Sequence, residues 1–335
     1  MNQELKEYVI KNAEIELRAI NYGASVTAIK VKDRDGNFEN ILASFDDLNS
    51  YLDYPDPYLN AIVGPTAGRI AYGEYRILDN DVKLSINNGK HHLHGGSTGI
   101  SRQYFEVEEI VQEKKKILRF TLETNHDIDG LTGKYYYEAD YIIEGNTLTM
   151  KTRCTPEKPA IINMTSHMYF NLSGELKSSI KKQLLKLPAK EKLVLHEDGH
   201  PYRIDSINKG SAFDFSELTV IEDNYSIGDE EFKISLGYDV AFILEDEPII
   251  LMDEESGRIM NIDTDQKCVV VYSANYFDES LILNNKIKGY PFSCIALETQ
   301  DIPNGINIDG IETKVYDKDN PYTQETIYTF YVDEK

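Results

Sequence analysis

Apolar and polar residues alternate along much of this chain, and this period-two pattern constrains its fold more than any other feature. Near the N-terminus, Ile15, Leu17 and Ala19 alternate with charged residues, and residues 117–123 repeat the pattern. Successive side chains of a β-strand point to opposite faces, so such alternation is typical of strands that bury one face. The chain is therefore predicted to consist mainly of half-buried β-strands.

Turn signals between the alternating segments predict hairpins. Residues 26–31 lead into Asp35-Gly36, and Gly145-Asn146 separates residues 135–143 from residues 148–150. Short turns rich in Asn, Asp and Gly are favoured between antiparallel strands. Further strands are predicted on either side of an acidic turn, at residues 248–252 and 258–262, and over a β-branched run at residues 268–272.

Helical patterns are rare and short. The clearest covers residues 44–52, where Ser44 and Asp47 resemble a variant of the capping box. Many short strands with frequent turns favour an all-β sandwich or barrel. No repeat of fixed period is visible, which argues against a propeller or solenoid.

The net charge limits which partners the protein can bind, and the cysteines bear on the cell compartment in which it works. A formal net charge of −22 disfavours nucleic acid and anionic membrane surfaces, although an acidic surface can also serve solubility alone. The first seven residues lack the features of a signal peptide, and no apolar stretch approaches the roughly 18 residues of a membrane span. The three cysteines form no CxxC pair. We expect a cytoplasmic protein with reduced thiols and a small-molecule ligand.

Two segments in the first third hold polar residues that neither alternation nor turns require. Arg69 stands among small and apolar residues, where it could donate to vicinal hydroxyls or be paired structurally. His92 and His94 are spaced like metal ligands on one strand face, but residues 95–99 supply no carboxylate, so no metal is expected. Gly95-Gly96 is expected instead to bring backbone close to a ligand held by His94.

Two later segments contain candidate acid–base groups. His167 lies among small and apolar neighbours, which suits either a satisfied core histidine or a proton donor. Glu298 ends an apolar strand, where a carboxylate is costly unless it is paired, so it is either part of a salt bridge or a base with a raised pKa. Asp239 is a second carboxylate at the end of an apolar segment, because it stands directly before the apolar run 240–244.

Taken together, these segments resemble the aldose 1-epimerases, or galactose mutarotases. The matching segments follow the family's order over nearly the full length: Asn21-Tyr22-Gly23-Ala24, residues 67–70 around the arginine, Leu93-His94-Gly95-Gly96, residues 166–172 around the second histidine, and Leu297-Glu298-Thr299-Gln300. The resemblance implies a large antiparallel β-sandwich with an open groove and few short helices. We expect one such domain over residues 1–335.

The resemblance also implies a reaction and roles for the candidate residues. The family opens the ring of a free aldose, such as galactose or glucose, and recloses it with the opposite configuration at C1, without cofactor or metal. Glu298 would be the base and His167 the acid, with His94 hydrogen-bonded near the ring oxygen. Arg69 and Asp239 would hold other hydroxyls. We expect a monomer or a homodimer.

The sequence departs from the family's pattern at sugar contacts. Gly68 replaces an asparagine that often precedes the arginine, and Val240-Ala241 replace a polar pair after Asp239. Val270 stands where a glutamine is common. These changes weaken the assignment of galactose or glucose as substrate but not the reaction type. The alternatives are a hexose-phosphate 1-epimerase, which would need a basic cluster at the groove, and a sugar-binding protein without catalysis.

Overall fold

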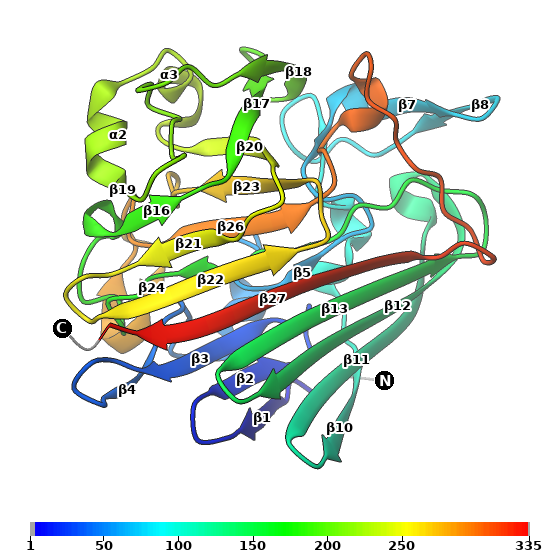
Figure 1. Cartoon of the computed structure of the whole chain (residues 1–335). Coiled ribbons are helices and arrows are strands. Elements are labelled where there is room, and N and C mark those ends of the chain that lie inside the picture. The colour runs from blue at the N-terminus through cyan, green and yellow to red at the C-terminus, as the bar shows by residue number, and fades with distance from the viewer. Residues whose placement is uncertain (1–3, 334–335) are drawn as a thin grey trace.

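Antiparallel β-sheets dominate the computed structural model, which describes residues 4–333. The largest sheet curves across the front of Figure 1. In sheet order its nine strands are β10 (Glu106–Gln112), β11 (Lys115–His126), β12 (Leu131–Glu144), β13 (Thr147–Pro156), β27 (Tyr322–Val332), β22 (Arg258–Thr264), β21 (Ile249–Met252), β16 (Leu184–Lys186) and β19 (Thr219–Val220).

A second sheet of six strands packs against the first and carries the candidate site. In sheet order its strands are β15 (Tyr169–Phe170), β26 (Ile295–Gln300), β23 (Cys268–Tyr272), β20 (Asp239–Leu244), β17 (Ala189–Leu195) and β18 (Pro201–Ser206). Its inward residues, such as Val271 and Leu297, share one buried cluster with Phe120, Met150 and Tyr328 of the nine-stranded sheet. This all-β, two-sheet packing confirms the predicted sandwich.

A smaller sheet extends the sandwich at the bottom of Figure 1. It consists of β1 (Glu7–Lys11), β2 (Glu16–Ile20), β3 (Val26–Lys32) and β4 (Phe38–Asn40). Two-stranded pieces complete the strands: β5 (Ile62–Val63) with β14 (Thr165–Ser166), β6 (Arg69–Ile70) with β9 (His92–Leu93), β7 (Glu74–Ile77) with β8 (Asn80–Lys83), and β24 (Ile282–Leu283) with β25 (Ile287–Lys288).

The predicted hairpins are confirmed. Strands β12 and β13 pair from Glu144 and Thr147 outward, around Gly145-Asn146. Strands β3 and β4 flank Asp35-Gly36, and β21 and β22 flank the acidic turn. The register follows from burial, because a slip of one residue would turn the apolar face of each strand to solvent.

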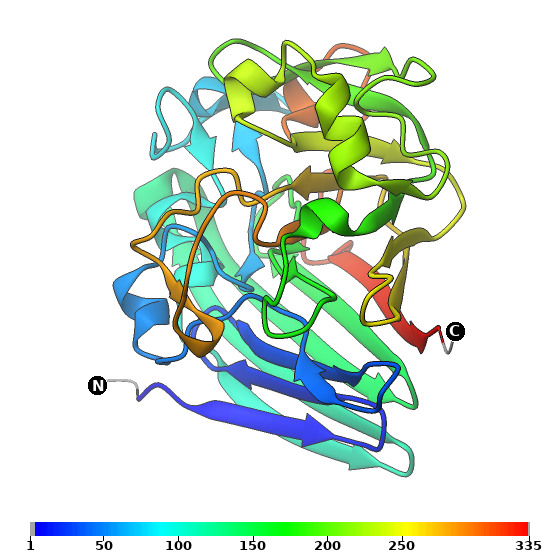
Figure 2. The ribbon, with the colours of Figure 1, turned by 90° about the vertical axis from the view of Figure 1, so that its left-hand side faces the viewer.

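The helix predicted over residues 44–52 is wrong. The described residues form three short α-helices, α1 (Ser50–Asp53), α2 (Ile221–Ile227) and α3 (Phe232–Ser235), and α1 begins only at Ser50. The backbone N–H of Ser44 instead donates to the side-chain oxygen of Asn284, and Phe45 forms a β-bridge with Leu283. Figure 2 shows α1 beside the segment that holds β24, so tertiary pairing overrides the local helical pattern. No described helix has the length and apolarity that a membrane crossing needs.

Candidate active site

The outer face of the six-stranded sheet forms the floor of a cavity of about 470 Å³. Along β26 the inward residues Leu297 and Thr299 face the core, while Glu298 and Gln300 line the cavity. The same alternation on β20 places Asp239 and Ala241 at the cavity and Val240 in the core. Period-two geometry thus lets each floor strand serve the core and the site at once.

His167 and Glu298 meet at the floor of this cavity. Tyr169 of β15 pairs with Ala296 of β26, so His167, two residues before Tyr169, comes beside Glu298. The His167 Nε2 lies 3.4 Å from the Glu298 Oε1. Both residues are about nineteen-twentieths buried, with exposed fractions of 5% and 3%.

Burial sets the protonation of this pair. Loss of solvation raises the pKa of Glu298 well above its ordinary value; Asp239 raises it further and Arg69 opposes the shift. Burial also lowers the pKa of His167, to about 4. Both shifts favour the neutral forms, in which the carboxyl group carries an acidic proton and the imidazole can accept one. Transfer of that proton to the imidazole across their contact would produce a carboxylate base and an imidazolium acid.

His94 provides a neutral donor close to the pair. The backbone N–H of Gly68 donates to the His94 Nδ1 at 3.2 Å, so the ring proton resides on Nε2. Burial, followed by the nearby His167 and Arg69, keeps the pKa of His94 well below its ordinary value. The ring centroids of His94 and His167 lie 5.5 Å apart.

The glycine prediction made for this segment is wrong. The backbone at Gly95 and Gly96 approaches protein groups rather than the cavity. A Cβ on Gly95 would overlap the Gly64 carbonyl oxygen, and one on Gly96 would overlap the Asp129 carboxylate. The two glycines therefore hold the segment that presents His94.

Arg69 and Asp239 form an ion pair at the cavity wall. Their Nη1 and Oδ2 atoms lie 3.5 Å apart, and each side chain keeps 21% of its surface exposed. The Nε of Arg69 donates to the Asn88 Oδ1 at 3.1 Å, which fixes the guanidinium from a second side. Fixed polar groups that stay partly exposed suit recognition of hydroxyls.

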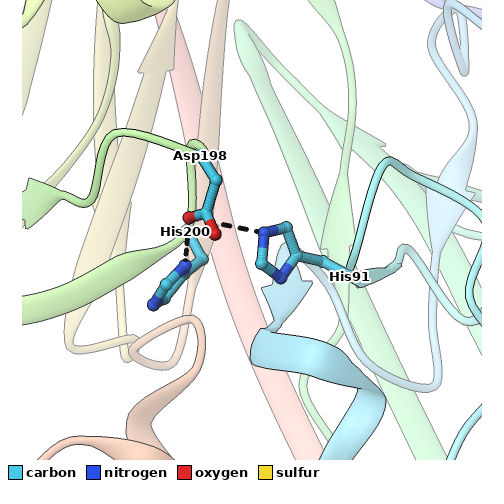
Figure 3. A group of neighbouring side chains, drawn as sticks. All are labelled: His91, Asp198 and His200. Atoms are coloured by element: carbon cyan, nitrogen blue, oxygen red, sulfur yellow. Dashed lines mark hydrogen bonds and ion pairs between the residues drawn. The ribbon is translucent and has the colours of Figure 1, made fainter.

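A cluster of histidines around Asp198 lies near Arg69, outside the residues that line the cavity. Figure 3 shows His91 and His200 on opposite sides of Asp198. The Asp198 Oδ1 lies 2.6 Å from the His200 Nδ1, 2.8 Å from the His196 Nδ1 and 3.5 Å from the His91 Nε2. These contacts lower the pKa of Asp198. The adjoining Gly199 faces the Arg69 guanidinium, and a Cβ added there would come into van der Waals contact with it.

Within residues 4–333, His91, Asp198 and His200 are the one group close enough to hold a metal ion. However, the Tyr72 backbone N–H donates to the His91 Nδ1 at 3.1 Å. The His91 Nε2 therefore carries the ring proton on the side that faces Asp198, which does not suit a metal ligand. Among the same residues, His92 and His94 belong to no such group.

The structure brings all five predicted site residues to one cavity: Arg69, His94, His167, Asp239 and Glu298. It also adds Tyr58, whose ring stacks 6.2 Å from that of His167 and meets His94 edge-on at 4.7 Å. Three departures from the family pattern, Gly68, Ala241 and Val270, line the cavity. Val240 does not, because it points into the core.

Comparison with known proteins agrees with this geometry. A family model described as aldose 1-epimerase matches residues 6–329. The galactose mutarotase of Bos taurus is 28% identical over 90% of this chain and 87% of its own length. The aldose 1-epimerase of Escherichia coli K12 is 29% identical over 70% of this chain and 66% of its own.

Solved structures show the same fold. The galactose 1-epimerase of Lactobacillus acidophilus superposes with a TM-score of 0.88 at 25% identity, covering 99% of this chain and 96% of that one. An aldose epimerase homologue from C. elegans also reaches 0.88, at 20% identity, covering 98% of this chain and 99% of that one. Fold and relatives together define an isomerase of the epimerase class. The chain belongs to the aldose 1-epimerase family.

Proposed function

We propose that this protein interconverts the α and β anomers of a free aldose by opening and reclosing the sugar ring, with no cofactor or metal. The observation that carries the proposal is the buried pair of Glu298 and His167, 3.4 Å apart at the cavity floor. Anomerisation needs one base and one acid that act on neighbouring atoms, and this pair supplies both.

In the proposed reaction, the Glu298 carboxylate takes the proton of the C1 hydroxyl as the His167 imidazolium protonates the ring oxygen. The C1–O5 bond breaks, and the electron pair of the C1 hydroxyl forms the aldehyde. Rotation about C1–C2 presents the other face of the aldehyde. The same two groups, with their protons exchanged, return the proton to the new C1 oxygen and take one from the O5 hydroxyl as the ring closes.

Neighbouring residues support the charges that this cycle creates. The positive charge of Arg69 favours the ionised form of Glu298, because it acts to lower the pKa of that carboxyl group. The Nε2–H of His94 would donate to an oxygen near the reacting bond, and Arg69 with Asp239 would hold further hydroxyls and fix the pose.

The cavity wall favours a neutral sugar over a phosphosugar. The described residues that line it include four aspartates, Asp53, Asp56, Asp239 and Asp278, besides Glu298, against the single guanidinium of Arg69. A phosphate group would meet mostly negative charge. We therefore favour the free aldose over the hexose-phosphate alternative. A matched acid and base, which sugar binding alone does not require, argues against a non-catalytic role.

Polarimetry on freshly dissolved α-D-galactose and α-D-glucose tests the proposal. The wild type should speed the decay of rotation, and Glu298→Gln and His167→Asn should each lower kcat by roughly 10²–10⁴-fold. Glu123→Gln, at an exposed position on β11, is the matched control and should keep full activity. A folded wild type that accelerates no free aldose would overturn the proposal, and glucose 6-phosphate and galactose 6-phosphate would then be tried.

We further propose a cytoplasmic location and a monomer or homodimer. Cys154, Cys268 and Cys294 are unpaired and buried, which supports a reducing compartment. Size-exclusion chromatography with light scattering would measure the oligomeric state.

A further inference from the structure

The cavity floor beside Glu298 is hydrocarbon. Strand register places Glu298 opposite Val270, and Val270 opposite Ala241. The next strand, β17, adds Leu193 and Leu195. These four aliphatic side chains line the cavity together with Glu298. We call Val270, Ala241, Leu193 and Leu195 the apolar row. It extends from the base across three neighbouring strands.

Hydrogen-bonding groups of the cavity lie elsewhere or are already engaged. Asp239 is opposite Tyr272, one step along the sheet from the apolar row, and it pairs with Arg69. The side chain of Gln300 reaches the same face, but its Oε1 accepts from Asn163 and its Nε2 donates to the Glu298 carbonyl. A sugar hydroxyl placed over Val270 and Ala241 therefore meets methyl groups.

Such a hydroxyl would be costly. A polar group that loses water without gaining a partner costs about 1–3 kcal/mol, whereas a C–H or methyl group in the same place gains from burial. A pocket that offers hydrocarbon thus selects against the hydroxylated sugar and in favour of its deoxy analogue.

We propose that the apolar row receives a deoxygenated carbon of the substrate, so that the preferred substrates are deoxyaldoses. This inference rests on the proposed epimerase function and names the substrate class of the same site. The chemistry at C1 and the ring oxygen is unchanged, because Glu298 and His167 act there and the apolar row lies beside them.

Matched sugar pairs test the inference by polarimetry. The pairs are 6-deoxy-D-galactose with D-galactose, 2-deoxy-D-glucose with D-glucose, and 6-deoxy-D-glucose with D-glucose. In at least one pair the deoxy sugar should have the higher kcat/KM, by roughly five- to a hundredfold. The pair that shows the effect identifies the carbon that faces the apolar row.

Two variants connect this preference to the row. Val270→Thr keeps the shape of the side chain and adds one hydroxyl, so it should shift the kcat/KM ratio back toward the hydroxylated sugar, by roughly three- to tenfold. Val270→Ala removes carbon without adding a polar group, so it should keep the deoxy preference. Thermal melting of both variants checks that they fold.

The outcomes separate the two proposals. If neither member of any pair is accelerated, the epimerase function itself fails. If the hydroxylated sugars are turned over as well as their deoxy partners in all three pairs, the epimerase stands and the deoxyaldose inference is overturned; the apolar row then only supports the C–H face of an ordinary pyranose. A deoxy preference that is unmoved in a folded Val270→Thr also overturns it.

Discussion

The imidazole of His167 and the carboxyl group of Glu298 lie 3.4 Å apart, although they come from distant parts of the chain, and both are almost fully buried. Burial moves their pKa values in opposite directions, downward for His167 and upward for Glu298. This relationship leads to testable consequences for stability as well as for activity.

His167→Asn should make the protein less sensitive to acid. The folded pKa of His167 is about 4, below its ordinary value of 6.5, so the unfolded chain gains a proton first as the pH falls between these values. Wild-type stability should lose about 1.4 kcal/mol per pH unit from this group over that window. Melting temperatures of both proteins from pH 7 to 4 measure the effect; parallel curves would contradict it.

Glu298→Gln should stabilise the protein increasingly as the pH rises. The folded pKa of Glu298 is raised, so its contribution is fully present below its ordinary pKa near 4.5 and is lost as the pH rises toward the folded value. Glutamine does not ionise and avoids this loss. Urea unfolding of variant and wild type at pH 5 and pH 8 should show a larger difference at pH 8, and an equal difference at both would refute the argument.

Asp198→Asn should weaken substrate binding more than catalysis. Asp198 contacts His91 and His200, and the charge of Arg69 is close enough to act on His91. In the proposed mechanism Arg69 does not contact the reacting bond. We expect KM to rise roughly three- to tenfold and kcat to fall by less than that, because Arg69 mainly holds hydroxyls but also favours the ionised form of Glu298. Asp205→Asn, in an exposed pair with Arg203 on the same hairpin, is the control and should change neither. A fall in kcat at constant KM would exclude this positioning role.

Treatment with EDTA should leave activity and melting temperature unchanged. The hydrogen bond from the Tyr72 backbone leaves the proton of His91 on Nε2, and Asp198 is hydrogen-bonded to His196 and His200 instead of being free to bind a metal. Metal analysis before dialysis, and activity before and after it, measure this directly. Recovery of lost activity on adding Zn²⁺ would show that the cluster binds a metal after all.

Gly95→Ala should be far more damaging than Gly36→Ala. Both glycines have φ near +80°, at 81° and 82°, but a Cβ at Gly95 meets the Gly64 carbonyl oxygen whereas the space around Gly36 is open. The strain of a left-handed alanine, about 1 kcal/mol, is common to both variants. The additional loss of melting temperature in Gly95→Ala reports the clash, and equal losses would mean that the backbone relaxes freely.

The sequence predicted those parts of the fold and site that depend on local pattern. Alternation and turn residues predicted the β12–β13 hairpin with its correct turn. The five site residues were found because each stands in a motif. The helix over residues 44–52 failed because pairing between Phe45 and Leu283 is long-range and leaves no local signal.

Other features could not be found from local pattern. Asp198 and His91 are far apart in the chain, and Tyr58 stacks on His167 without any motif around it. Val240 is the exception, because alternation alone places it on the opposite face from Asp239 and Ala241, so its position in the core could have been predicted.

The alternation on β20, β23 and β26 also limits how this enzyme can evolve. In each floor strand, neighbouring side chains point to opposite faces of the sheet. On β23, Val269 and Val271 point into the core, whereas Val270 lines the cavity. Inserting or deleting one residue would turn each side chain to the other face of the sheet. Glu298 or Tyr272 would then lie in the interior, and aliphatic core side chains would lie under the sugar. Within the floor, substrate preference can therefore change through replacement of single side chains at every second position, while the lengths of the floor strands stay constant.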